Sequence, residues 1–323
     1  LQAVADAHRQ GHRIGERSGD YLYSKLNNGM AIIVNYFAGE DLLTLRKEIR
    51  DLILKMRGPS DKSFIGWGNV SLIHMQLVVL QDGEERLNEE RLDDIPGQRA
   101  VVGDLGKPDA TVLLLDKILS VQRLFFFRRF DVITFDDINI SEEMSEKKHF
   151  LRPNLLMGIF FEGLVAFQCA RRESNDSSKE KWVHIGESIL KRMRCFSDHS
   201  LWNWENKSLL LLAEKMYTEG NFDRAASCYD RALQSTIDHK FVHEEAIACE
   251  LAGDFYYERN FHQKSLEFFK HSIKCYTKWG AFAVARRLES SLGIKLGSDI
   301  AQLVPNNDCL EAICSSNCGP LKK

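Results

Sequence analysis

Two stretches of equal length decide the fold: LLLLAEKMYTEGNFDRAASCYDRA at residues 209–232 and CELAGDFYYERNFHQKSLEFFKHS at residues 249–272. In both stretches, small or apolar residues lie before a turn residue. After the turn come a small residue, an aromatic residue and a second small residue, at the same spacing in each stretch. The turn residues, Gly220 and Asn260, tolerate the left-handed backbone conformation. Small residues let two antiparallel helices approach closely, and the aromatic residue fills the gap between neighbouring pairs. The pattern predicts two divergent tetratricopeptide-like hairpins, at a period of 40 residues where such repeats usually have roughly 34.

The remainder of the chain also favours helices. Only six of its 323 residues are proline, so long stretches contain nothing that would break a helix. Gly19 suits a helix end, Asp20 suits the next helix start, and an apolar stripe of helical period follows Asp41. Residues 132–140 are expected as an extended connector and residues 172–181 as a solvated loop. The predicted helices include residues 1–15, 20–37, 42–57, 70–82, 110–130, 154–171, 182–196, 208–219 and 281–292.

These expectations combine into one all-α architecture. Residues 1–295 are predicted to form a single array of antiparallel helical hairpins, stacked as a tetratricopeptide-like α-solenoid. The repeats are clearest over residues 205–290, and a long polar connection is expected at about residues 83–109. Residues 296–323 lose the helical period and are predicted to be a flexible tail that contains Cys309, Cys314 and Cys318.

Composition and charge argue against nucleic acid and the membrane interior as partners of this chain. The formal net charge is −3 and the isoelectric point is near 6.4, which gives no reason to expect nucleic acid as a partner. The most apolar run, residues 155–170, is shorter than the roughly 20 apolar residues that span a bilayer, so no membrane span is expected. Eight cysteines spread singly do not resemble a secreted disulfide framework, and the charged residues among the first fifteen are not those expected of a signal peptide. The expected location is the cytoplasm.

Tests for catalytic and metal-binding motifs assign no site residue. Gly103–Pro108 lacks the spacing and the hydroxyl of a phosphate loop, and Gly66-Trp67-Gly68 lacks the third glycine of a dinucleotide fingerprint. His243-Glu244-Glu245 lacks a second histidine four positions after the first, where Ile247 stands. The tail cysteines are the sharpest metal or redox candidate, but they lack the paired spacing and the four ligands of a closed zinc site.

Three other patterns are better explained by surface or core roles. No Gly-x-Ser-x-Gly nucleophile elbow occurs. The pairs Asp93-Asp94 and Asp136-Asp137 are interpreted as surface charge, and Phe125–Phe130 as a core face with two rim arginines in place of a nucleic-acid stacking platform. We therefore expect no cofactor and no catalysis in this segment. A weaker alternative is an α-helical enzyme in which residues 83–109 act as a lid.

Residues 244–256, together with the later segments 275–281 and 287–289, go beyond generic repeat periodicity. They resemble the helical region of large multidomain signalling proteins. In those proteins the helical region follows a STAND/AAA-type ATPase module. In that family a protein kinase domain often lies upstream, and a histidine kinase or nucleotide cyclase commonly follows. The similarity is strong over about residues 205–290 and moderate over residues 1–56. None of the family's catalytic residues belongs to this region, so the resemblance carries none over.

The resemblance implies a non-catalytic helical region that binds a protein, a peptide or adjacent domains of the same chain and relays signals. The alternative is a free-standing tetratricopeptide adaptor that binds a peptide or protein in trans. In either case a concave groove would be the binding surface. Four side chains are expected to be exposed and to line it: Tyr257, Arg259, Lys264 and His271.

Overall fold

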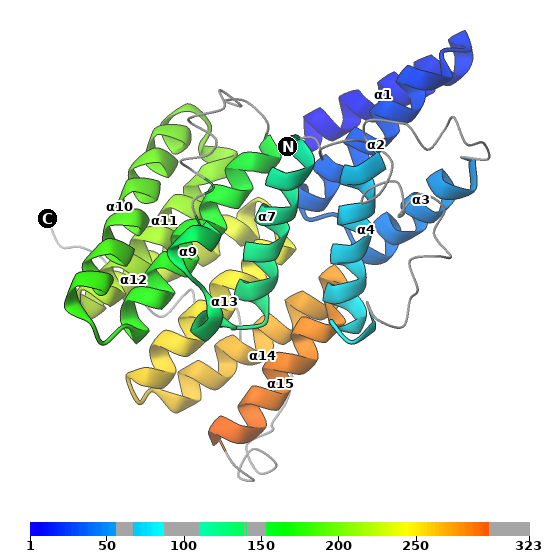
Figure 1. Cartoon of the computed structure of the whole chain (residues 1–323). Coiled ribbons are helices and arrows are strands. Elements are labelled where there is room, and N and C mark those ends of the chain that lie inside the picture. Colours follow the sequence, from blue (N-terminus) through cyan, green and yellow to red (C-terminus); the bar gives the residue numbers. More distant parts are fainter. Residues whose placement is uncertain (56–66, 87–109, 139, 141–152, 297–323) are drawn as a thin grey trace, which may run out of the picture.

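A computed structural model of the chain describes residues 1–55, 67–86, 110–138, 140 and 153–296 (Figure 1). Every regular element within these ranges is helical, which confirms the all-α class. Two short 3-10 helices, η3 (Phe130–Val132) and η4 (Phe135–Ile138), follow α7. The α-helices are α1 (Gln2–Ser18), α2 (Tyr21–Ala38), α3 (Leu42–Lys55), α4 (Trp67–Asp82), α7 (Ala110–Phe126), α9 (Pro153–Arg172), α10 (Asp176–His199), α11 (Leu201–Thr218), α12 (Phe222–Asp238), α13 (Val242–Glu258), α14 (His262–Trp279) and α15 (Phe282–Leu296).

The two hairpins predicted from the repeat pattern form at the expected places. Helices α11 and α12 pack against each other around the turn at Gly220, and α13 and α14 around the turn at Asn260. Both turn residues have left-handed backbone angles, with φ of 76° at Gly220 and 63° at Asn260. The predicted turn chemistry is therefore confirmed.

The small residues of the second hairpin permit its close packing. A Cβ atom on Gly253 of α13 would lie 2.7 Å from the ring of Phe269 on α14, too close for any larger side chain. The Ser265 hydroxyl donates to the Gly253 carbonyl at 2.8 Å, and the Ser272 hydroxyl donates to the Ala246 carbonyl at 2.8 Å. The aromatic positions of the two hairpins, Tyr229 and Phe269, are both buried.

A third close hairpin opens the chain and extends from one end of the molecule (Figure 1). Where α1 crosses α2, a Cβ atom on Gly15 would lie 2.8 Å from the Cβ atom of Ser24. The Ser24 hydroxyl and the His12 ring nitrogen Nδ1 are hydrogen-bonded at 2.7 Å. Asp20 caps α2 as predicted, because its carboxylate accepts the backbone N–H of Tyr23 at 3.3 Å.

Helix α7 joins the N-terminal helices to the C-terminal ones. It lies between α4 and α9 (Figure 1) and packs against both. Its last residue, Phe126, contacts Phe161 of α9 at a ring-centroid distance of 5.5 Å, and Tyr276 and Trp279 of α14 at 6.1 and 5.8 Å. A single hydrophobic core therefore runs from α2 to α15.

The structure corrects three of the predicted connections. Helix α10 begins at Asp176, not at residue 182, because the Asn175 side chain caps it by accepting the Ser178 N–H at 3.0 Å. The loop predicted at 172–181 is thus much shorter. Helix α11 begins at Leu201 instead of residue 208. The region predicted as an extended connector, 132–140, contains the 3-10 helix η4, and Asp137 accepts the backbone N–H and the hydroxyl of Thr134.

Most of the polar connection at 83–109 and nearly all of the predicted tail at 296–323 lie outside the described residues. None of the helices described is both long enough and apolar enough to cross a membrane.

The repeat register can be tested by truncating its two aromatic residues. Tyr229→Ala and Phe269→Ala should each lower the free energy of unfolding by about 3–5 kcal/mol, because both remove a buried ring from a close-packed interface. Denaturant melts followed by circular dichroism measure this change. Leu43→Ala is a matched control, because Leu43 is 53% exposed and should be nearly neutral. Near-neutral values for both aromatic variants would contradict the register.

Candidate functional site

The four side chains expected to line an open groove are mostly engaged in contacts around the α13–α14 hairpin. Arg259 is exposed, but its guanidinium lies 4.0 Å from the ring centroid of Phe222. Lys264 is partly buried and donates to the Tyr256 hydroxyl at 2.8 Å. Tyr257 and His271 are also partly buried. The prediction that all four are exposed is therefore wrong for three of them.

The other side of the same hairpin is covered by N-terminal helices of this chain. The Trp279 indole N–H at the end of α14 donates to the backbone carbonyl of Glu40 at 3.1 Å. A Cβ atom on Gly39 would lie 1.9 Å from the His243 ring, so only glycine fits between the α2–α3 turn and α13. The Tyr36 ring lies 6.5 Å from the Trp279 ring. The space left in this interface, bordered by Tyr36, Phe126, Met157, Trp279 and their neighbours, is about 10 Å³. Such a volume holds one water molecule at most.

Glu250 of α13 is a buried carboxylate that contacts three other parts of the chain. Its carboxylate accepts from Arg128 Nε at 2.8 Å, from both terminal nitrogens of Arg287 at 2.5 and 3.0 Å, and from the Tyr276 hydroxyl at 2.8 Å. Burial alone would raise the pKa of Glu250, but the two guanidinium groups outweigh it and lower that pKa to about 2. Arg128 also pairs with Asp254 at 3.0 Å. These contacts tie the segment after α7 to α13 and α15.

Two further buried glutamates repeat this arrangement. Glu214 of α11 accepts from Arg171 at 2.6 Å and from the Tyr229 hydroxyl at 2.5 Å. Glu244 of α13 pairs with Lys207 at 2.6 Å. Burial would raise the pKa of Glu244, yet the Lys207 ammonium outweighs it and lowers that pKa to about 2. Each of these three buried carboxylates is therefore paired with a cation from another part of the chain, as buried charges require.

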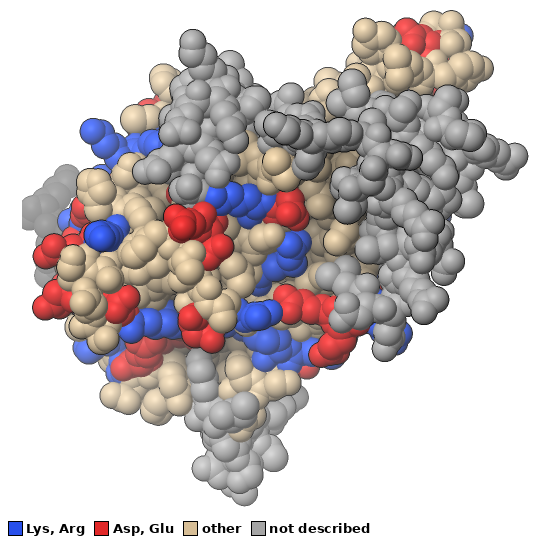
Figure 2. Space-filling model, in the orientation of Figure 1, with Lys and Arg blue, Asp and Glu red and all other residues tan. Residues whose placement is uncertain are grey.

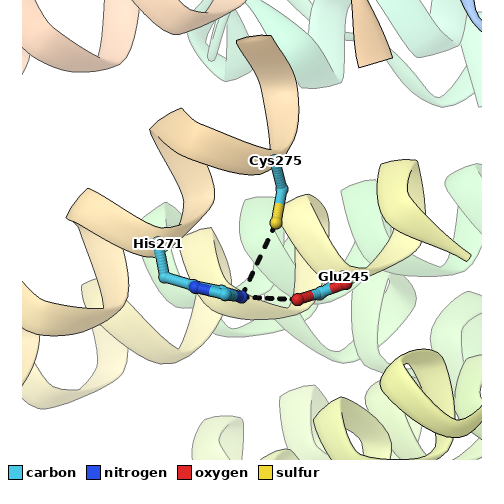
Figure 3. A group of neighbouring side chains, drawn as sticks. All are labelled: Glu245, His271 and Cys275. Carbon is cyan, nitrogen blue, oxygen red and sulfur yellow. Dashed lines mark hydrogen bonds and ion pairs between the residues drawn. The ribbon is translucent and has the colours of Figure 1, made fainter. Parts of the chain in front are cut away.

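A different cluster joins α13 and α14 on the partly exposed side of the hairpin: Glu245, His271 and Cys275 (Figure 3). His271 Nε2 lies 2.5 Å from a carboxylate oxygen of Glu245 and 3.6 Å from the sulfur of Cys275. The ligand atoms of all three side chains lie within 4.8 Å of one another. His271 and Cys275 are four residues apart on one face of α14, and Glu245 reaches them from α13.

The cluster does not form a cysteine–histidine–carboxylate relay. Such a relay needs the base on one ring nitrogen and the orienting carboxylate on the other. Here Glu245 and Cys275 both meet the same nitrogen, Nε2. Burial and the neighbouring Glu245 carboxylate raise the pKa of the Cys275 thiol to about 12, which keeps it protonated at neutral pH. A carboxylate oxygen, an imidazole nitrogen and a sulfur together are instead a donor set for a metal ion.

The motifs considered in the sequence have mixed outcomes. His243 is buried beside Glu244, with 3.4 Å between His243 Nε2 and Glu244 Oε1, and Ile247 belongs to the core. The aromatics of Phe125–Phe130 are largely core residues, as predicted; Arg129 is exposed, whereas Arg128 is only partly exposed and pairs with Glu250. The other candidates lie outside the described residues: Asp93, Asp94, Gly103–Pro108, Cys309, Cys314 and Cys318.

Sequence reasoning missed the Glu245–His271–Cys275 cluster. A partial signal was present, because His271-x3-Cys275 on α14 has the spacing that places two side chains on one helix face. Glu245 lies 26 residues before His271 in the chain, and this separation concealed the cluster. The Arg128–Glu250 contact had no such signal, since its partners are 122 residues apart.

The face of the molecule in Figure 2 mixes lysine and arginine with aspartate and glutamate over its described part. This mixture agrees with the formal net charge of −3. It differs from the single-sign basic stripe by which nucleic-acid-binding domains hold phosphates.

The Glu250 contact predicts a specific pH dependence. At pH 7, Glu250→Gln should lower the free energy of unfolding by about 3–5 kcal/mol, because Arg128 and Arg287 lose the buried carboxylate with which they pair. The pKa of Glu250 is depressed in the folded state, so its stabilising effect is present above the unfolded value of 4.5 and is lost as the pH falls towards 2. The difference between wild type and variant should therefore shrink over that range. Denaturant melts at pH 7, 4 and 3 measure it, with the exposed Glu84→Gln as control. A pH-independent difference would contradict the assignment.

Comparison of the chain with protein-family models, with curated proteins and with solved structures finds no match.

Proposed function

We propose that this chain is a tetratricopeptide-like helical-repeat region that binds a protein partner or an adjacent domain and relays its state. Following the resemblance in sequence, its setting is a multidomain signal-transduction ATPase or kinase, in the cytoplasm. The observation that carries the proposal is the hydrogen bond between Trp279 at the end of α14 and Glu40 in the α2–α3 turn, two residues that are 239 positions apart in the chain.

The succession of helices supports a stacked α-solenoid. From α9 to α15 each helix packs against the next one along the chain, with the closest contacts within the α9–α10, α11–α12 and α13–α14 pairs. The α12–α13 contact connects one pair to the next, and the α14–α15 contact connects the last pair to the final helix. This is the nearest-neighbour packing on which helical repeats depend.

Contacts between distant segments support a relay. The Arg286 guanidinium of α15 donates to the backbone carbonyls of Gln81 and Asp82 at the end of α4, both at 3.3 Å. Close-packed interiors transmit displacements because they have few voids to absorb them. A movement imposed on α1–α4 would therefore reach α11–α15.

Exposed apolar side chains support a protein contact. At the start of α2, Tyr21, Leu22 and Tyr23 are 66%, 65% and 59% exposed. Ile14 on the neighbouring helix α1 is 56% exposed. Adjacent large apolar residues of this kind are typical of surfaces that another protein covers.

The runner-up function is a free-standing adaptor that binds a peptide or protein in trans. The coding sequence on either side of this segment distinguishes the signalling region from the free-standing adaptor. A phosphate-loop motif in the same reading frame supports the signalling ATPase setting. A reading frame confined to this helical region would favour the adaptor and overturn the proposed setting.

The relay itself can be tested by hydrogen–deuterium exchange. Trp279→Phe removes the indole N–H that donates to Glu40 and should raise amide exchange in α2 and the α2–α3 turn as well as in α14, because the two regions share this contact. Phe261→Ala is the control, since Phe261 is 58% exposed and lies just before α14. Faster exchange confined to α14 in the Trp279 variant would show that the two regions are not coupled.

A further inference from the structure

The Glu245–His271–Cys275 cluster combines three kinds of metal-ligating atom on two packed helices (Figure 3). Helices α13 and α14 form the most extensively packed pair of the structure. Their backbones therefore hold the three side chains in place without help from a ligand. We propose that Glu245, His271 and Cys275 form a binding site for a transition-metal dication of the Zn²⁺ type, with the fourth coordination position open to solvent.

The spacing of the ligand atoms fits tetrahedral coordination. Zn–N bonds of about 2.0–2.1 Å and Zn–S bonds of about 2.3 Å place the nitrogen and sulfur roughly 3.5 Å apart. His271 Nε2 and Cys275 Sγ are 3.6 Å apart. The carboxylate oxygen of Glu245 is 2.5 Å from Nε2, and a metal ion would widen this separation to roughly 3.3 Å. That change requires only a side-chain movement of Glu245.

The donor set selects the class of metal. Magnesium and calcium prefer oxygen ligands, and they are disfavoured by a sulfur and an imidazole nitrogen. Zinc accepts carboxylate, imidazole and thiolate together. Binding replaces the thiol proton of Cys275, which passes to water. The thiolate and the Glu245 carboxylate then balance the two charges of the ion.

The fourth position is assigned to solvent because the site is open to it. The side chains of His271 and Glu245 are 12% and 14% exposed, so two of the three ligands reach the surface of the hairpin. Cys249, four residues after Glu245 on α13, is fully buried and is not a member of the compact group. Three protein ligands with an open position are the arrangement of exchangeable and catalytic zinc sites, whereas structural sites are closed by four.

The surroundings of His271 limit the affinity of the site for a metal ion. A metal-bound histidine usually donates its other N–H to a carboxylate or a carbonyl, and loss of that partner weakens binding about 10- to 100-fold. His271 Nδ1 is buried and has no hydrogen-bond partner among the described residues. The site is therefore inferred to exchange its metal, in contrast to a zinc ion that is required for folding.

Cobalt titration of the chelator-treated full chain tests the site. The tail cysteines are first replaced in the variant Cys309→Ser/Cys314→Ser/Cys318→Ser, so that they cannot supply the thiolate. The expected result is one equivalent of bound Co²⁺ with thiolate-to-metal charge-transfer absorption, which Zn²⁺ displaces. Absence of that absorption at one equivalent would overturn the proposal.

Single substitutions in the same background assign the ligands. Cys275→Ser should abolish the charge-transfer absorption, and Glu245→Gln and His271→Gln should each weaken Zn²⁺ binding by at least about tenfold. Cys249→Ala, a matched change on the same hairpin, should leave the affinity unchanged. Circular dichroism confirms that each variant is folded. Retained absorption in Cys275→Ser, or an equal loss in Cys249→Ala and Cys275→Ser, would overturn the three-ligand assignment.

Discussion

The burial of the Glu250 carboxylate between two arginines is the constraint on which the rest of the structure depends. A lone carboxylate in this position would be strongly destabilising, and the two cations that pair with it come from different parts of the chain. Arg287 comes from α15, and Arg128 comes from the segment after α7. Arg128 has a left-handed backbone angle, φ 57°, which costs about 1–2 kcal/mol for a residue other than glycine. The ion pair holds it there.

Aromatic residues pack around this ion pair. The Phe126 ring contacts the rings of both Tyr276 and Trp279, and these contacts join α7 to α14. The polar groups of Tyr276 and Trp279 are both hydrogen-bonded, because the Tyr276 hydroxyl donates to the Glu250 carboxylate and the Trp279 indole N–H donates to the Glu40 backbone carbonyl. A low-dielectric surrounding strengthens the Glu250 pairs and makes any unpaired neighbour costly. Packing and charge thus enforce the same arrangement of helices.

Local features of the fold were accessible from the sequence, and long-range ones were not. The turns at Gly220 and Asn260 follow from residue type alone, because few residues tolerate a positive φ. The first turns of α10 were missed because residues 176–181 are polar and show no apolar stripe, so only the cap at Asn175 marks the start. The Arg128–Glu250 pair and the Glu245–His271–Cys275 cluster depend on which helices become neighbours. Hydrophobic periodicity within one helix contains no such information.

The contact between Trp279 and Glu40 has a consequence for how this architecture can evolve. A linear array whose units touch only their neighbours can gain or lose a unit, since nothing else depends on its length. Here the end of α14 is fastened to the α2–α3 turn, where Gly39 leaves no room for a side chain beside His243. An inserted or deleted hairpin would separate these surfaces and expose the Trp279 ring. The described helices between α3 and α14 are therefore constrained by this long-range contact as well as by the contacts between neighbouring helices.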